Sequence, residues 1–215
     1  MKIVIIDDHP VVRKGLRTIL EENGYIVCGE AEDGNTAVKI VADTEPDLAI
    51  VDIELKGSVN GIELISALKT RFSRLSILVM SMDDGTLYAE RSIQAGAKGY
   101  VTKAEASDNI INAIETVMNG KLFLSRSISE KIAGKHILGS VDESEVNVSL
   151  LSPREFEIFS LLGKGYKRNE ISKKLGMNIN TIESHRRNIR DKLNLKDSSE
   201  ITKAAVRWVV KEKPD

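Results

Sequence analysis

Acidic side chains stand directly after two short apolar segments of this sequence. Asp7 and Asp8 follow the first segment, and Asp52 follows the third. Ser81 and Lys103 come at or just after the ends of two later apolar segments. If these segments are parallel β-strands, their carboxyl ends share one edge of a sheet, where functional groups collect. Three carboxylates, one hydroxyl and one ammonium group would then converge at that edge.

Such a cluster has a definite chemistry. Three packed carboxylates repel one another and raise each other's pKa values, and a hard divalent cation such as Mg²⁺ removes that penalty. One carboxylate can then attack a phosphoryl group while the cation and a lysine neutralise the transferring oxygens. Asp52 is the best nucleophile because it projects from a central strand. Lys103 would pair with the phosphoryl group, and Ser81 would donate a hydrogen bond to it.

The alternative for Asp7, Asp8 and Asp52 is that each merely caps a neighbouring helix, as single strand-end aspartates usually do. Their coincidence with a serine and a lysine favours the phosphoryl site. His9 follows the acidic pair, but Mg²⁺ prefers oxygen ligands, so we expect His9 to have a structural or loop role.

The elements that must position this cluster alternate regularly. Apolar runs at 3–6, 25–28, 48–51, 77–80 and 99–101 predict strands. Amphipathic patterns at 11–23, 34–43, 61–72, 86–95 and 107–119 predict the helices between them. Five such units predict a parallel sheet in a three-layer α/β domain, with helices on both faces.

The remainder of the chain is organised differently. Residues 125–137 suggest one extra helix, and the polar segment 138–150 lacks periodicity and suggests a linker. The sequence Ser152-Pro-Arg-Glu155 predicts a helix start. Three further helices are expected near 168–175, 179–194 and 198–210. The predicted domains are an α/β domain at 1–120, a helix and linker at 121–149, and an all-α domain at 150–215.

Charge separates these domains. Residues 1–149 carry 16 Lys and Arg against 23 Asp and Glu, a net charge of −7, whereas residues 150–215 carry 15 against 9, a net charge of +6. A basic end on an acidic body suggests that only the C-terminal part meets a polyanion. No apolar stretch approaches the about 18 residues of a membrane span, and the single cysteine, Cys28, allows no internal disulfide. We therefore expect a cytoplasmic protein.

The all-α domain contains two helices joined by a short turn, a pattern typical of helix-turn-helix DNA binding. Asn178 is expected to cap the second helix, and Glu183, Ser184, Arg187 and Asn188 would point away from its apolar side. Arg187 is placed to donate to guanine, and Asn188 to contact a base or a phosphate. The apolar side consists of Ile171, Leu175, Ile182, Ile189 and Leu193. The expected phosphate partners are Lys167, Arg168, Arg186, Arg190 and Lys192. A basic helical module for protein interaction is the alternative.

Residues 1–120 resemble the receiver domain of two-component response regulators, through Asp7-Asp8, Asp52, Ser81, Tyr100 and Lys103 in order and spacing. The resemblance implies a flavodoxin-like fold and phosphorylation of Asp52 by a sensor histidine kinase. It implies that Asp8, Asp52 and the backbone carbonyl of Glu54 hold Mg²⁺, that Asp7 acts through water, and that Ser81 and Tyr100 form a switch pair. Lys56 and Ala104 replace prolines that are common in the family.

Residues 150–215 resemble the LuxR-type helix-turn-helix through Leu151-Ser-Pro-Arg-Glu155, Asn169-Glu-Ile-Ser172 and Thr181-Ile-Glu-Ser-His185. Together the two resemblances place the chain in the NarL/FixJ class of response regulators. They imply binding to double-stranded promoter DNA, contact with the transcription machinery and a homodimer on DNA. Glu183 stands where the family often has lysine. The last helix would supply the dimer face, through Ile201, Ala204, Ala205 and Trp208.

Two other functions fit parts of the pattern. A regulator that no longer depends on phosphate could use the first domain only as a dimer platform. A phosphohydrolase with an aspartyl-phosphate intermediate would use Asp52-Ile-Glu54, but such enzymes carry the nucleophile on the first strand and need a substrate pocket. We expect the chain to accept a phosphoryl group on its own aspartate without turning over a separate substrate.

Overall fold

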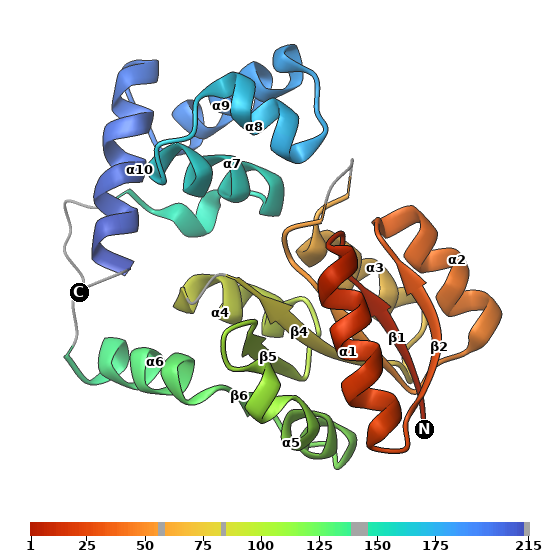
Figure 1. Cartoon of the computed structure of the whole chain (residues 1–215). Helices are drawn as coiled ribbons and strands as arrows, with labels where there is room; N and C mark the ends of the chain where they lie inside the picture. Colours follow the sequence, from red (N-terminus) through yellow and green to blue (C-terminus); the bar gives the residue numbers. More distant parts are fainter. Residues whose placement is uncertain (56–58, 83–84, 139–145, 213–215) are drawn as a thin grey trace. The chain divides into compact units, whose positions relative to one another are not determined.

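A computed structural model of the chain describes residues 1–55, 59–82, 85–138 and 146–212 (Figure 1). These residues fall into two compact units, divided between Leu138 and Gly139. Lys56 and residues 139–145 of the expected linker lie outside the described residues. No helix in the described ranges is long and apolar enough to cross a membrane.

The first unit is built on a parallel sheet of six strands in the order β2-β1-β3-β4-β5-β6. The strands are β1 (Lys2–Ile6), β2 (Ile26–Ala31), β3 (Leu48–Val51), β4 (Ser76–Ser81), β5 (Gly99–Thr102) and β6 (Phe123–Leu124). The five predicted strands are confirmed, although β2 runs three residues further than its apolar run. The sequence did not predict β6, because two residues carry no periodicity.

Helices cover both faces of this sheet, as predicted. They are α1 (Pro10–Glu22), α2 (Gly34–Thr44), α3 (Gly61–Arg71), α4 (Thr86–Gln94), α5 (Ala106–Met118) and α6 (Arg126–Leu138). One face packs against α1 and α5 in a core that includes Ile3, Ile50, Leu16 and Ile110. The helices α2, α3 and α4 follow one another on the other face. This burial of both faces explains why the strands read as continuous apolar runs.

The strand order places the acidic residues side by side. β1 and β3 are neighbours in register from Ile3 with Leu48 to Ile6 with Val51, and the Asp52 amide donates to the Ile6 carbonyl at 2.8 Å. Since β1 pairs with β2 on its other side, the crevice outside β1 and β3 is the point where the strand order reverses. Ligands bind at such switch points in open α/β sheets.

The start of α3 lies against the backbone that follows Asp52. The Gly61 amide donates to the Ile53 carbonyl at 3.0 Å. A side-chain carbon at position 61 would overlap the Asp52 carbonyl oxygen and come within 2.8 Å of the Ile53 carbonyl oxygen. Asn60 and Glu63 form a capping box at this helix start. Only glycine therefore fits at the first position of α3.

The second unit is all-helical. It contains the 3₁₀ turn η1 (Val148–Leu150) and the helices α7 (Pro153–Gly163), α8 (Arg168–Leu175), α9 (Ile179–Lys192) and α10 (Ser198–Glu212). The predicted caps are confirmed: Ser152 and Glu155 form a capping box on α7, and Asn178 accepts from the Asn180 amide at the start of α9. The predicted apolar side is confirmed as buried core: Ile171, Leu175, Ile182, Ile189 and Leu193.

Candidate functional site

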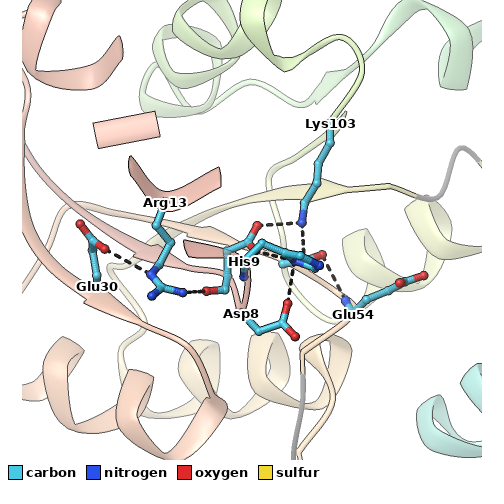
Figure 2. A network of polar contacts seen from close by, with 8 residues as sticks. Asp8, His9, Arg13, Glu30, Glu54 and Lys103 are labelled. Atoms are coloured by element: carbon cyan, nitrogen blue, oxygen red, sulfur yellow. Dashed lines mark hydrogen bonds and ion pairs between the residues drawn. The ribbon is translucent and has the colours of Figure 1, made fainter. Parts of the chain in front are cut away.

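The carboxyl edge of the sheet brings together the acidic residues and Lys103 (Figure 2). The Lys103 Nζ lies 2.6 Å from Asp52 Oδ2 and 2.8 Å from Asp7 Oδ2. The Asp7 and Asp52 side chains are each 1% exposed, and that of Lys103 is 8% exposed. The Lys103 amide also donates to the Ser81 carbonyl at 2.7 Å, which holds the end of β5 against the end of β4.

Burial dominates the electrostatics of this cluster. It raises the pKa of Asp52 to about 6, where Lys103 lowers the value and the nearby Asp7 raises it further. Burial also disfavours the ammonium form of Lys103, but the charges and hydrogen bonds of Asp52 and Asp7 outweigh it and raise the Lys103 pKa above its ordinary value. One ammonium group therefore does not fully compensate three buried carboxylates. A further cation would stabilise the cluster.

The donor set fits a hard divalent cation. Ligand atoms of Asp7, Asp8, His9 and Asp52 all lie within 4.8 Å of one another, and the three carboxylates are buried. The Glu54 amide donates to Asp52 Oδ1 at 3.1 Å, which holds the turn after β3 against the Asp52 carboxylate (Figure 2). Carboxylate and carbonyl oxygens are the ligands that Mg²⁺ prefers.

His9 contacts both carboxylates of the acidic pair. Its Nδ1 lies 2.7 Å from Asp8 Oδ1 and 3.1 Å from Asp7 Oδ1, while its side chain remains 54% exposed. These contacts are compatible with the expected structural or loop role, which stays a prediction. Its position next to the acidic pair was the available signal.

Arg13 is a residue of this region that the sequence did not mark. Its Nη1 donates to the Asp7 carbonyl at 2.6 Å, and its Nε to Glu30 Oε2 at 3.2 Å (Figure 2). Glu30 lies on β2 and also pairs with Arg17. The network ties α1 to β2 and holds the turn that carries the acidic pair. No sequence spacing reveals it, because Glu30 comes from a neighbouring strand.

The two remaining residues of the predicted site are buried in the sheet. Ser81 ends β4 and Tyr100 lies in β5, and both are 0% exposed. Ser81 pairs in register with Thr102, and Tyr100 with Val79. The predicted switch pair thus lies on β4, the neighbour of β3, and on β5, the strand beyond it, from whose end Lys103 reaches Asp52.

In the second unit, one side of α9 carries the candidate base contacts. Thr181, Ser184, Arg187 and Asn188 are exposed on α9, opposite the buried Ile182 and other core residues. Exposed residues at the start of α8 add two cations and an amide: Lys167, Arg168 and Asn169. These exposed residues of α9 and of the start of α8 are polar or basic.

Three of the predicted phosphate partners have carboxylate partners within the unit. Lys192 Nζ lies 2.6 Å from Glu155 Oε2, which joins the end of α9 to the start of α7. Arg186 pairs with Glu183 at 3.0 Å and is only 15% exposed. Arg190 pairs with Asp191 at 2.8 Å. The Lys192 side chain is also 41% exposed, so its predicted phosphate contact stays a prediction.

The predicted dimer face lies on α10. Ile201 and Ala205 are 0% exposed, since α10 packs against α7 and α9. Trp208 stacks edge-on against Phe156, with ring centroids 5.1 Å apart. Ile201 and Ala205 therefore belong to the core of the unit, whereas Ala204 and Trp208 are half-buried, and their part in a dimer face stays a prediction. The exposed apolar residues of α10 are Val206, 41% exposed, and Val210, 66% exposed.

Comparison with known proteins gives one matching family for each of the two units. Residues 3–115 match the response regulator receiver domain, and residues 149–205 match the bacterial regulatory proteins of the luxR family. The oxygen regulatory proteins NreC of Staphylococcus epidermidis and Staphylococcus aureus are each 33% identical over 212 residues, which cover 96% of this chain and 97% of theirs.

Solved structures give the same result for the fold. RcsB of Salmonella enterica serovar Typhimurium, bound to a promoter in the presence of the phosphomimetic BeF3⁻, is 28% identical with a TM-score of 0.65, over 96% of this chain and 98% of that chain. A LuxR-family response regulator from Aurantimonas is 34% identical with a TM-score of 0.61, over 63% of this chain and 97% of that one.

Proposed function

Because this chain belongs to the two-component response regulators that combine a receiver domain with a LuxR-type DNA-binding domain, we propose that phosphorylation of Asp52 controls its binding to promoter DNA. The observation that carries the proposal is the contact of one buried lysine, Lys103, with two buried carboxylates, Asp52 and Asp7. In this proposal the nucleophile Asp52, the cation Lys103 and the metal-binding carboxylates lie in one site.

Each residue has a distinct role in this proposal. Asp52 Oδ attacks the phosphorus of a phosphohistidine on a sensor kinase, a P–O bond forms and the P–N bond breaks, so the imidazole leaves. Lys103 neutralises charge on the transferring oxygens. Ser81 donates a hydrogen bond to the bound phosphoryl group, and Tyr100 moves with it as the second member of the switch pair. The chain accepts one phosphoryl group and turns over no separate substrate.

The metal role follows from the donor set. Asp8, Asp52 and the Glu54 carbonyl would hold Mg²⁺, and Asp7 would act through water. When bound, the ion supplies positive charge that offsets the crowded carboxylates and the incoming phosphoryl oxygens. Arg13 holds the turn that presents Asp7 and Asp8.

The DNA-binding role rests on the exposed side of α9. Arg187, Asn188, Thr181 and Ser184 would reach bases or nearby phosphates, while Lys167, Arg168, Asn169 and Arg190 would contact the backbone. Glu183 holds Arg186 by an ion pair, and DNA would have to compete for that guanidinium. A homodimer on DNA would use the exposed Val206 and Val210 of α10. With a kinase, a promoter and the transcription machinery as partners, the protein would act in the cytoplasm.

The first experiment measures both halves of the proposal together. Incubation with Mg²⁺ and acetyl phosphate should add one acid-labile phosphoryl group per chain, detected by intact-mass spectrometry. The phosphorylated form should bind cognate promoter DNA more tightly, measured by fluorescence anisotropy at fixed salt. Equal DNA affinity of both forms would instead favour a regulator that uses the receiver domain only as a dimer platform.

Arg187→Ala is expected to weaken cognate DNA binding by about 1–3 kcal/mol and to relax specificity at one base pair. The reason is that Arg187 is exposed on α9 and forms no ion pair with another described residue. Titrations against cognate and single-substituted sites provide the measurement. Lys192→Ala is the control, because Lys192 pairs with Glu155 and its loss should reduce stability more than specificity. A loss for Arg187→Ala that is uniform over all sequences would make it a phosphate contact.

A further inference from the structure

Glu105 collects hydrogen bonds from two segments that are far apart in the sequence. Its Oε2 accepts from Thr102 Oγ1 at 2.8 Å and from Ser127 Oγ at 3.3 Å. The Ser127 hydroxyl itself lies 3.4 Å from the hydroxyl of Ser125. Burial alone would raise the pKa of Glu105, but these donors outweigh it and lower the pKa, so the group stays ionised. One anion thus joins the end of β5 to the segment after β6.

The second of these segments is the start of α6. Ser125 precedes the helix and is 1% exposed, and Ser127 lies in its first turn. The first amides of a helix have no partner within it, and an anion there also offsets the positive end of the helix dipole. Glu105 therefore acts as a cap of α6 from a different loop, because it holds the Ser127 hydroxyl of the first turn and places a negative charge beside the helix start.

The first segment is the turn that carries Lys103. Lys103 lies two residues before Glu105, and the Glu105 amide donates to the Thr102 carbonyl at 3.1 Å, which closes a tight turn around it. The Lys103 ammonium reaches Asp52 from this turn. The Ser125 amide in turn donates to the carbonyl of Tyr100 at 3.1 Å. The start of α6 is therefore attached on both sides to residues of the candidate phosphorylation site.

We propose that Glu105 couples the state of Asp52 to the start of α6, so that phosphorylation releases this cap. When Asp52 carries a phosphoryl group, the negative charge that pairs with Lys103 lies further from the Asp52 backbone. Lys103 moves with that charge and displaces the tight turn that carries Glu105. The Glu105 carboxylate then loses its hydrogen bond to Ser127 in the first turn of α6. The inference rests on the proposed phosphorylation of Asp52. The proposed coupling connects the phosphorylation site directly to α6. In the sequence, α6 leads into the segment before the DNA-binding unit.

Hydrogen exchange of the full-length protein tests the coupling. In the wild type, Mg²⁺ with beryllofluoride should speed exchange of the first-turn amides of α6 by roughly three- to tenfold, the effect of losing one helix cap. In Glu105→Ala these amides should exchange fast in both states, and the response to beryllofluoride should vanish. Phosphoryl incorporation from acetyl phosphate should stay within about twofold of wild type, since Glu105 does not touch Asp52.

Glu130→Ala is the matched control. Glu130 pairs with Arg126 in the same first turns of α6, at 2.7 Å, but it has no contact with the Lys103 turn. This variant should keep the wild-type response to beryllofluoride. Ser127→Ala is a milder test of the same cap if Glu105→Ala folds poorly, and it should reduce the response.

The outcomes separate the coupling from the proposed function. A full response in Glu105→Ala, or no response in the wild type while fluorine NMR shows bound beryllofluoride, would overturn the coupling alone. Wild-type protein that binds no beryllofluoride and takes up no phosphoryl group would overturn the coupling and the proposed function together.

Discussion

Asp52→Asn is expected to take up no phosphoryl group and, at the same time, to be more stable than the wild type in the absence of metal. The amide cannot attack phosphorus, so incorporation from acetyl phosphate should fall to zero in intact-mass spectra. The same change removes a buried charge from a cluster that Lys103 only partly compensates. A substitution that abolishes activity while it raises the free energy of unfolding is typical of a functional site that is built at a cost in stability.

The sign and size of the stability effect follow from the pKa of Asp52. Burial raises it from 3.8 to about 6 in the folded chain. Between these values the unfolded chain has lost its proton and the folded chain has not, so wild-type stability falls as pH rises from about 4 to about 6. The loss is complete above pH 6 and amounts to at most about 3 kcal/mol, since each pKa unit corresponds to about 1.4 kcal/mol. Asp52→Asn should remove this loss.

Calorimetry in EDTA at pH 4 and pH 7.5 would measure the difference. The single tryptophan, Trp208, lies in the second unit, so its fluorescence serves as an internal reference that the change should leave unaltered. The advantage of Asp52→Asn should shrink at pH 4 and also on addition of Mg²⁺. A variant less stable than the wild type at pH 7.5 without metal would mean that the ion pair with Lys103, not the buried charge, dominates at this site.

Gly61→Ala should lower the free energy of unfolding of the first unit by about 2–4 kcal/mol, the range of severe overpacking. The added carbon would overlap the Asp52 carbonyl, and backbone atoms cannot move aside as a flexible side chain can. The displaced turn also carries Glu54, whose amide holds Asp52 Oδ1. Phosphoryl incorporation should therefore fall together with stability.

Gly15→Ala is the matched control for this effect. Gly15 lies inside α1, and a carbon added there meets no atom within 4 Å. Alanine should stabilise that helix by about 0.5–1 kcal/mol, because glycine is a poor helix former. Denaturant unfolding of both variants gives the comparison. If Gly61→Ala were as harmless as Gly15→Ala, the tight packing of α3 against the Asp52 turn would be wrong.

The sequence predicted most of the sheet and the convergence of Asp7, Asp8, Asp52 and Lys103, because parallel strands that are buried on both faces read as apolar runs. The ends of such strands lie at one edge whatever the loops do. It could not predict the contacts of His9 and Arg13, which depend on side-chain direction and on a partner from another strand.

In the second unit, the sequence could not predict which neighbours a side chain contacts within the fold. Counting apolar positions on the last helix suggested a free face at Ile201 and Ala205, but three packed helices require those residues as core. Counting cations suggested that Lys192 contacts DNA, which stays a prediction, and composition does not reveal its ion pair with the buried Glu155. In both cases the sequence pattern predicted the helix but not the neighbour of the side chain.

The short strand β6 matters for anyone who wishes to exchange the signal-receiving module of this regulator with that of another. A fragment that stops at residue 120 loses the Phe123 and Ser125 amides, which donate to the carbonyls of Lys98 and Tyr100. Its outermost strand would then present an open row of backbone groups, a template for association with other chains. A transplantable module should therefore extend through Leu138, and hybrids joined earlier are expected to aggregate.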